Sequence, residues 1–168
     1  IKNNNKKEIH DTQNRSLEFS LLISLPSAVG LFILSFPIIH ILFERGAFSS
    51  EDTIYTAQVL SFFSLGLPAY ILIKVLVTCF FAREDTKTPL YISIISVFLN
   101  IFISLMLIST MREMGIALAT AISAWVNALL LFFILNFKRK LILDSIFIKN
   151  IFKIIIAVFI MFFGCYIL

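Results

Sequence analysis

The stretch TPLYISIISVFLNIFISLMLISTM, residues 88–111, contains no Asp, Glu, Lys or Arg. About 20 apolar residues in a helix cross the hydrocarbon core of a bilayer, so this stretch is long enough to span a membrane. Three further uncharged stretches lie at residues 19–43, 53–73 and 114–137, and a fifth apolar stretch runs from 151 to 168. The pattern predicts an all-α, polytopic transmembrane helix bundle of about five membrane-spanning helices.

Composition supports a membrane protein and excludes other classes. Hydrophobic residues make up 60% of the chain, with 19 Phe, and the mean hydropathy is +0.99. Soluble domains are about half apolar and need only one apolar stripe per helix. A transmembrane β-barrel is also disfavoured, because its strands alternate polar and apolar residues over about ten positions.

The positions of the cations predict the orientation. Eleven of the 14 Lys and Arg residues lie before the first stretch, between the second and third, or from the end of the fourth to the first residues of the fifth. These are Lys2, Lys6, Lys7, Arg15, Arg83, Lys87, Lys138, Arg139, Lys140, Lys149 and Lys153. By the positive-inside rule these segments, and with them the N-terminal end, are cytoplasmic. The distribution of the cations along the chain thus accounts for the net charge of +4 as a feature of membrane topology, and we expect no nucleic-acid partner.

The chain divides into four predicted segments. Residues 1–15 form a polar cytoplasmic connector, and residues 16–137 form four transmembrane helices. Residues 138–150 form a basic cytoplasmic loop, and residues 151–168 begin a further transmembrane helix that is cut short. Because the chain starts with Ile1 and stops inside an apolar stretch, we expect a fragment of a longer protein.

Proline and glycine predict bends within the spans. Pro26 and Pro37 should kink or break the first helix, and Gly66 and Pro68 should interrupt the second. We interpret these four residues as helix hinges.

Helix ends and a packing face can also be predicted. Ser49 and Asp52 have the spacing of a capping box at the start of the second helix, and Thr88-Pro89 resembles a cap followed by a first-turn proline. Small or polar residues recur every four positions in the fourth helix, which favours close helix packing. They are Gly115, Ala119, Ser123 and Asn127.

Three cations are candidates for contact with an anionic substrate. Lys74 is the one charged side chain deep within a span, where burial of charge costs about 2.5–3.5 kcal/mol on insertion scales. It either faces a cavity that accepts an anionic headgroup, or extends toward the membrane surface or a helix-end carbonyl. Arg83 and Lys87, between the second and third spans, either contact lipid phosphates or close a gate, or belong to a solvated turn.

A second polar set comprises Asn100, Ser104, Thr120 and Asn127. If the third and fourth helices are antiparallel neighbours, Ser104 and Thr120 lie at similar depth, where oxygen atoms could hold a small hard cation such as Na⁺. Without a carboxylate such a site is weak, and ordinary interhelical hydrogen bonds are the alternative.

Other chemistry is not indicated by the sequence. The two His and two Cys residues are isolated, and no nucleophile–base pair or phosphate-binding glycine loop occurs. We therefore predict no catalytic residue, no metal cluster and no cofactor, with an ion gradient or the membrane potential as the driving force for a transport role.

Three stretches together resemble the MurJ/MviN family of lipid II flippases. They are LPSAVGLFILSFPIIHILFERGAFS (25–49), LSFFSLGLPAYILIKVLVTCFFAREDTKTP (60–89) and NIFISLMLISTMREMGIALATAISAWVNALLL (100–131). The resemblance implies a fourteen-helix inner-membrane transporter of the multidrug/oligosaccharidyl-lipid/polysaccharide exporter superfamily. This chain would be most of its C-terminal lobe and would pack against the remaining helices of the full protein.

The resemblance also implies a substrate and an ion. Such proteins expose lipid II, a lipid-linked disaccharide-pentapeptide, to the periplasm by alternating access. Some bind Na⁺ where Asn100, Ser104, the carbonyl of Ile116 and Thr120 fall in this sequence. A carboxylate expected near Ser104 is missing, which weakens the case for ion coupling.

Two other interpretations stay open at this point. An exporter of another polyprenyl-linked glycan would have the same fold, and a non-transporting scaffold or remnant would have lost the N-terminal lobe. An open reading frame upstream that encodes about eight further apolar segments would favour a transporter.

Overall fold

The computed structural model describes the backbone of residues 2–137 and 144–167 and the side chains of residues 10–137 and 144–165. Within these ranges every regular element is an α-helix. In chain order they are α1 (Lys2–Ile33), α2 (Ser35–Phe43), α3 (Ser50–Phe81), α4 (Lys87–Met111), α5 (Glu113–Phe137) and α6 (Ser145–Ile167). Five of them, all except α2, are long and apolar enough to cross a membrane. The prediction of an all-α bundle with about five spans is confirmed.

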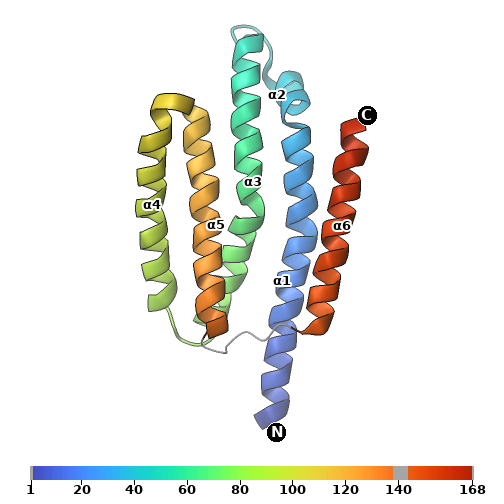
Figure 1. Cartoon of the computed structure of the whole chain (residues 1–168), viewed down its shortest axis with the longest axis vertical. Coiled ribbons are helices and arrows are strands. Elements are labelled where there is room, and N and C mark those ends of the chain that lie inside the picture. Colours follow the sequence, from blue (N-terminus) through green and yellow to red (C-terminus); the bar gives the residue numbers. More distant parts are fainter. Residues whose placement is uncertain (1, 138–143, 168) are drawn as a thin grey trace.

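The helices run up and down along one long axis (Figure 1). The N-terminus, the α3–α4 turn and the start of α6 lie at one end, and the α2–α3 and α4–α5 turns lie at the other. The described loops and ends that we predicted to be cytoplasmic are thus on the same end of the bundle. Lys138, Arg139 and Lys140 lie outside the described residues.

The first predicted helix differs from expectation in both its start and its breaks. We predicted that it begins at Ser16, but α1 begins at Lys2, so the described part of the 1–15 connector is helical and continuous with the span. The one break falls at Leu34, between α1 and α2. Pro37 explains it, because a proline ring clashes with the carbonyl four residues earlier, and that residue, Ile33, ends α1.

Contrary to our prediction, Pro68 does not interrupt the second predicted helix. Pro26 likewise does not break the first. Pro26 lies inside α1, and both Gly66 and Pro68 lie inside α3, which is one helix from Ser50 to Phe81. The ribbon of α3 does change direction about halfway along its length (Figure 1). A proline within a membrane helix is tolerated when neighbouring groups satisfy the freed backbone carbonyls.

The predicted capping box at α3 is confirmed, whereas the start of α4 needs correction. Ser49 Oγ accepts the backbone N–H of Asp52, and the Asp52 carboxylate accepts the backbone N–H of Ser49. At α4, Thr88 is not the cap, because the helix already begins at Lys87. The Asp85 carboxylate accepts the Thr88 N–H at 3.2 Å and satisfies a free donor of the first turn.

Small residues bring helices close together at two places. The face of α5 that we predicted from Gly115, Ala119, Ser123 and Asn127 is buried. A Cβ added at Gly66 of α3 would lie 3.2 Å from the Cα of Ala121 in α5. A Cβ added at Gly115 would lie 2.8 Å from the carbonyl oxygen of Leu107 in α4. These contacts fix α5 between α3 and α4.

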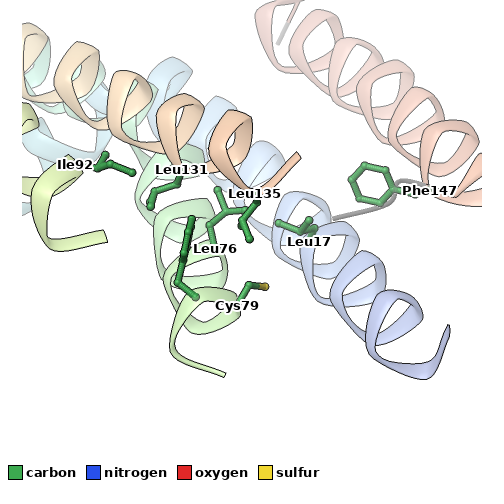
Figure 2. Close-up of a cluster of buried hydrophobic side chains, with 8 residues drawn as sticks. Leu17, Leu76, Cys79, Ile92, Leu131, Leu135 and Phe147 are labelled. Carbon is green, nitrogen blue, oxygen red and sulfur yellow. The ribbon is translucent and has the colours of Figure 1, made fainter. Parts of the chain in front are cut away.

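A hydrophobic cluster joins the helices toward the N-terminal end of the bundle. Figure 2 shows Leu76 and Cys79 of α3 beside Leu131 and Leu135 of α5, with Leu17 of α1 next to them. Phe147 of α6 and Ile92 of α4 belong to the same cluster. Because it draws on all five long helices, this cluster fixes their relative positions at that end.

Polar contacts attach α6 to α1. Asn150 Nδ2 donates to Glu18 Oε1 at 2.6 Å, and Arg15 lies between Glu18 and Asp144, with its nitrogens 2.6 Å and 3.6 Å from their carboxylates. The Asp144 carboxylate also accepts the N–H of Phe147 and so begins the helix. The fifth span therefore begins at Ser145, six residues before the predicted position of 151.

A carboxylate closes the turn between α2 and α3. Glu44 accepts a hydrogen bond from Ser50 Oγ at 2.7 Å and lies 2.6 Å from His40 Nδ1. These partners, Ser50 first, lower the pKa of Glu44 to about 2 from an ordinary value of 4.5. The anion thus ties the end of α2 to the first turn of α3.

We predict that Gly115→Ala lowers the thermal stability of the full-length protein in detergent. The new methyl group would overlap the backbone of Leu107, which cannot move aside as a flexible side chain can. Overpacking of this kind costs about 1–3 kcal/mol. Gly30→Ala is the matched control, because a Cβ there meets nothing within 4 Å. Equal melting temperatures for the two variants would contradict the close approach.

The lowered pKa of Glu44 predicts a pH-dependent contribution to stability. Its ionised form is favoured in the folded protein, so the contribution is present above pH 4.5 and is lost as the pH falls through about 2. The melting-temperature difference between wild type and Glu44→Gln should therefore shrink across that range. Glu51→Gln is the control, because the Glu51 carboxylate makes no hydrogen bond in the described structure. A difference that is independent of pH would be inconsistent with this contribution.

Candidate substrate and ion site

Lys74 lies on an exposed face of α3 within a predicted span. It is seven residues before the helix end at Phe81, which is about 10 Å along the axis at ~1.5 Å per residue. None of the described carboxylates forms an ion pair with it. Its own carbonyl accepts the hydroxyl of Thr78 at 2.8 Å. The ammonium is therefore open to a partner that this chain does not supply within the described residues.

Arg83 and Lys87 lie in and beside the α3–α4 turn, at the end of α3 nearest Lys74. Arg83 is partly buried, and its Nη2 donates to Gln13 Oε1 of α1 at 3.4 Å. It thereby links α1 to α3. Lys87 is exposed in the first turn of α4. The structure does not bring these two cations together with Lys74 in a described pocket.

Three of the four residues of the predicted polar set, Asn100, Ser104 and Thr120, belong to a connected network between α4 and α5. Asn100 Nδ2 donates to Ser123 Oγ at 3.0 Å, and Ser104 Oγ donates to Asn100 Oδ1 at 3.2 Å. Ser123 Oγ in turn donates to the carbonyl of Thr120 at 3.0 Å. The Thr120 hydroxyl donates to the carbonyl of Ile116 at 2.7 Å. The oxygens proposed for an ion are thus engaged with one another.

Asn100, Thr120 and Ser123 line an open groove of about 400 Å³ between α3, α4 and α5. Ser104 is not part of its wall and is joined to it through the hydrogen bond to Asn100. Its other polar walls are Tyr70 of α3, Ser93 and Ser96 of α4, and Asn127 of α5. Asn127 is buried, and its Oδ1 has no hydrogen-bond partner. None of the residues that line the groove is charged, and Ile73, Val97, Ile101 and Ala124 make the rest of its wall apolar.

Uncharged oxygens limit what this groove can bind. Hydroxyl, amide and carbonyl oxygens are suitable ligands for Na⁺, but a site without a carboxylate holds it weakly. The described residues also contain no group of three or more His, Cys, Asp or Glu side chains that could hold a metal ion. The alternative of interhelical hydrogen bonds, left open by the sequence, matches the bond that Asn100 of α4 makes to Ser123 of α5, whereas the bond between Ser104 and Asn100 lies within α4.

The sequence analysis missed part of this groove. Ser93 and Ser96 lie on the same face of α4 as Asn100 and Ser104, at spacings of three, four and four residues. Such spacing follows one helix face, so the polar stripe could have been extended toward the start of α4. Its tertiary partner, Ser123, had been assigned only to the packing face.

Comparison with known proteins places the chain in a family. The sequence profile described as "Lipid II flippase MurJ" matches residues 1–168. The chain belongs to the MurJ family. This finding confirms the resemblance, and with the five spans it indicates a multi-pass bacterial membrane protein.

Curated relatives show how much of the family's length this chain represents. "Probable lipid II flippase MurJ" of Rhizobium meliloti (strain 1021) is 42% identical over 161 residues, which is 96% of this chain and 30% of that protein. "Lipid II flippase MurJ" of Thermosipho africanus (strain TCF52B) is 35% identical over 130 residues, 77% of this chain and 27% of that protein. The chain thus spans less than a third of either MurJ relative.

If the groove is an ion site weakened by the missing carboxylate, Ser104→Asp should strengthen it. We expect the full-length variant to melt at a higher temperature in Na⁺ than in K⁺, because a carboxylate adds the charge that hard cations favour. Wild type should show no such difference between the two salts. Ser104→Asn is the control, since it adds a polar oxygen without charge. Identical responses of both variants to Na⁺ would argue for a purely structural hydrogen-bond network.

Proposed function

We propose that the full-length protein is a flippase that moves lipid II across the inner membrane by alternating access. The match of the MurJ profile to the whole chain is the observation that carries this proposal. The relatives named lipid II flippases support it. The chain would supply most of the C-terminal lobe of a fourteen-helix transporter.

The orientation follows from the distribution of charge. With the N-terminal end in the cytoplasm, Arg15 lies in the N-terminal half of α1, toward the cytoplasm, and Arg83 and Lys87 lie at the cytoplasmic α3–α4 turn. The opposite turns carry Arg45 and Arg112 together with acidic residues. The positive-inside rule favours this arrangement, and the placement of the described turns at two opposite ends of the bundle is consistent with it.

Lys74 is the residue we propose for contact with the substrate. Lipid II carries a diphosphate, and an unpaired ammonium at membrane depth supplies positive potential toward such an anion. Its exposure on α3 and the absence of a described carboxylate beside it support this role. Arg83 and Lys87 would add to the positive potential at the cytoplasmic entrance.

The bends provide the movement in this proposal. Rocking of one helix bundle against another gives alternating access in transporters of this kind. Pro37 at the α1–α2 break, and Gly66 with Pro68 in the bent α3, are placed where helices can change direction. Pro26 is a further candidate within α1. A gradient of Na⁺ or the membrane potential would drive the cycle, with the oxygens of Asn100, Ser104, Ile116 and Thr120 as the weak ion site.

We predict that Lys74→Ala in the full-length protein lowers lipid II export by roughly tenfold or more. The reason is the loss of one charge-assisted contact, worth about 1.5–3 kcal/mol. Lys74→Arg is the matched control, because it retains the positive charge. Export is measured as lipid II accessible at the periplasmic face, and membrane abundance is measured by immunoblot. Normal export by Lys74→Ala at normal abundance would exclude this role.

The same assay separates the alternative substrates. If lipid II export is unchanged when the wild-type protein is depleted, the family assignment stands but the substrate is another polyprenyl-linked glycan. If depletion changes no exported glycan, the scaffold interpretation applies.

A further inference from the structure

Side chains donate to carbonyls in the turn before each of the two prolines inside long helices, but from different places. A proline lacks the N–H of a helical residue and its ring pushes on the preceding turn, so the helix is weakened there and can bend. In α1, the hydroxyl of Ser27, beside Pro26, donates to the carbonyl of Ile23 at 2.8 Å. The donor is thus on the same helix, and no other helix takes part in this bond.

In α3 the donor comes from another helix. Trp125 Nε1 of α5 donates to the carbonyl of Leu65 at 2.9 Å. Leu65 stands three residues before Pro68, in the same relation as Ile23 to Pro26. An indole nitrogen is a donor only, so this bond has one direction. The state of the α3 bend is therefore coupled to the position of α5.

The two helices also approach each other closely in this region. Gly66 follows Leu65, and a Cβ on it would lie 3.2 Å from Ala121 Cα, one helical turn before Trp125. Ala69, Ala124 and Ala128 form a small buried cluster beside it, with Trp125 packed against that cluster. Small residues hold the backbones together here, and the indole is the large side chain that bridges them.

The indole also has free space on both sides. It lines an apolar pocket of about 430 Å³ with Leu72, Leu76 and Phe132. It lines a second apolar pocket of about 510 Å³ with Leu65, Pro68 and Phe162. A ring in a close-packed core cannot turn without displacing neighbours, whereas this ring can turn into an existing pocket. The bond to Leu65 can therefore break without unfolding the bundle.

We propose that Trp125 is the positioning residue of the α3 bend. Its hydrogen bond to Leu65 holds α3 in the bent form against α5, and release of the bond lets the two halves of α3 change their angle. Because Lys74 lies in the second half, beyond Pro68, the bond determines where Lys74 points. This role rests on the proposed function, in which the hinges of α3 move during transport.

The test is a double-mutant cycle read by hydrogen–deuterium exchange of the full-length protein in lipid nanodiscs. Trp125→Phe should speed exchange of residues 66–73 by about tenfold, as expected when one hydrogen bond that closes a local opening is lost. Phe162→Leu is the control, since it removes an aromatic side chain from the same pocket but no hydrogen bond. Replacement of Trp125 by benzothienylalanine, which keeps the ring shape without the N–H, answers the question if the Phe variant does not fold.

Making Trp125→Phe in a protein that also carries Pro68→Ala shows whether the Trp125 hydrogen bond acts on the bend at Pro68 or stabilises α3 in general. There the restored N–H lets α3 straighten, so Trp125→Phe should add no further exchange. Unchanged exchange in the single variant, or an equal increase in the Pro68→Ala background, would overturn the inference. Exchange does not require transport: failure of lipid II export by the wild type would refute the proposed function while this result still stands.

Discussion

The hydrocarbon core of a bilayer offers no hydrogen-bond partner, so every backbone polar group inside it must find one within the protein. Helices meet this requirement, and the described spans of this chain are all helical. Many of their hydroxyl groups donate to carbonyls of their own helix, as Ser96 and Thr120 do. Prolines are where this internal pairing fails. The helix α1 ends at Ile33, four residues before Pro37, and side chains donate to carbonyls next to the other two prolines, from Ser27 near Pro26 and from Trp125 near Pro68.

The helix α3 is the element on which the candidate sites depend. It packs against α1, α2 and α5, and its close approach to α5 at Gly66 requires the absence of a side chain. One of its faces carries Lys74, and another forms a wall of the uncharged groove through Tyr70. A change in the α3 bend would therefore move the cation and alter the groove together. In the proposed transport cycle, this link would let the charged group and the groove change together.

Features encoded locally could be predicted from the sequence, and features set by distant partners could not. Uncharged stretches fixed the number of spans, and Ser49 with Asp52 fixed the start of α3, because both depend on neighbouring residues. The Asn100–Ser104 pair follows from one helix face, although its bond to Ser123 needed the fold. The continuation of α3 through Pro68 was mispredicted, since the helix that packs against this part of α3 and donates to Leu65 through Trp125 lies 57 residues later. The early start of α1 was missed because polar residues outside the membrane form helix without an apolar signal.

Lipid II exposure at the periplasmic face, measured after depletion of the full-length protein in its native cells, tests the central claim most directly. Accessible lipid II is quantified by an externally added enzyme that modifies only the exposed headgroup, and total lipid II is quantified in extracts. A flippase predicts that the exposed fraction falls while lipid II accumulates on the cytoplasmic side. An unchanged exposed fraction, in cells without a second lipid II flippase, would contradict the assignment.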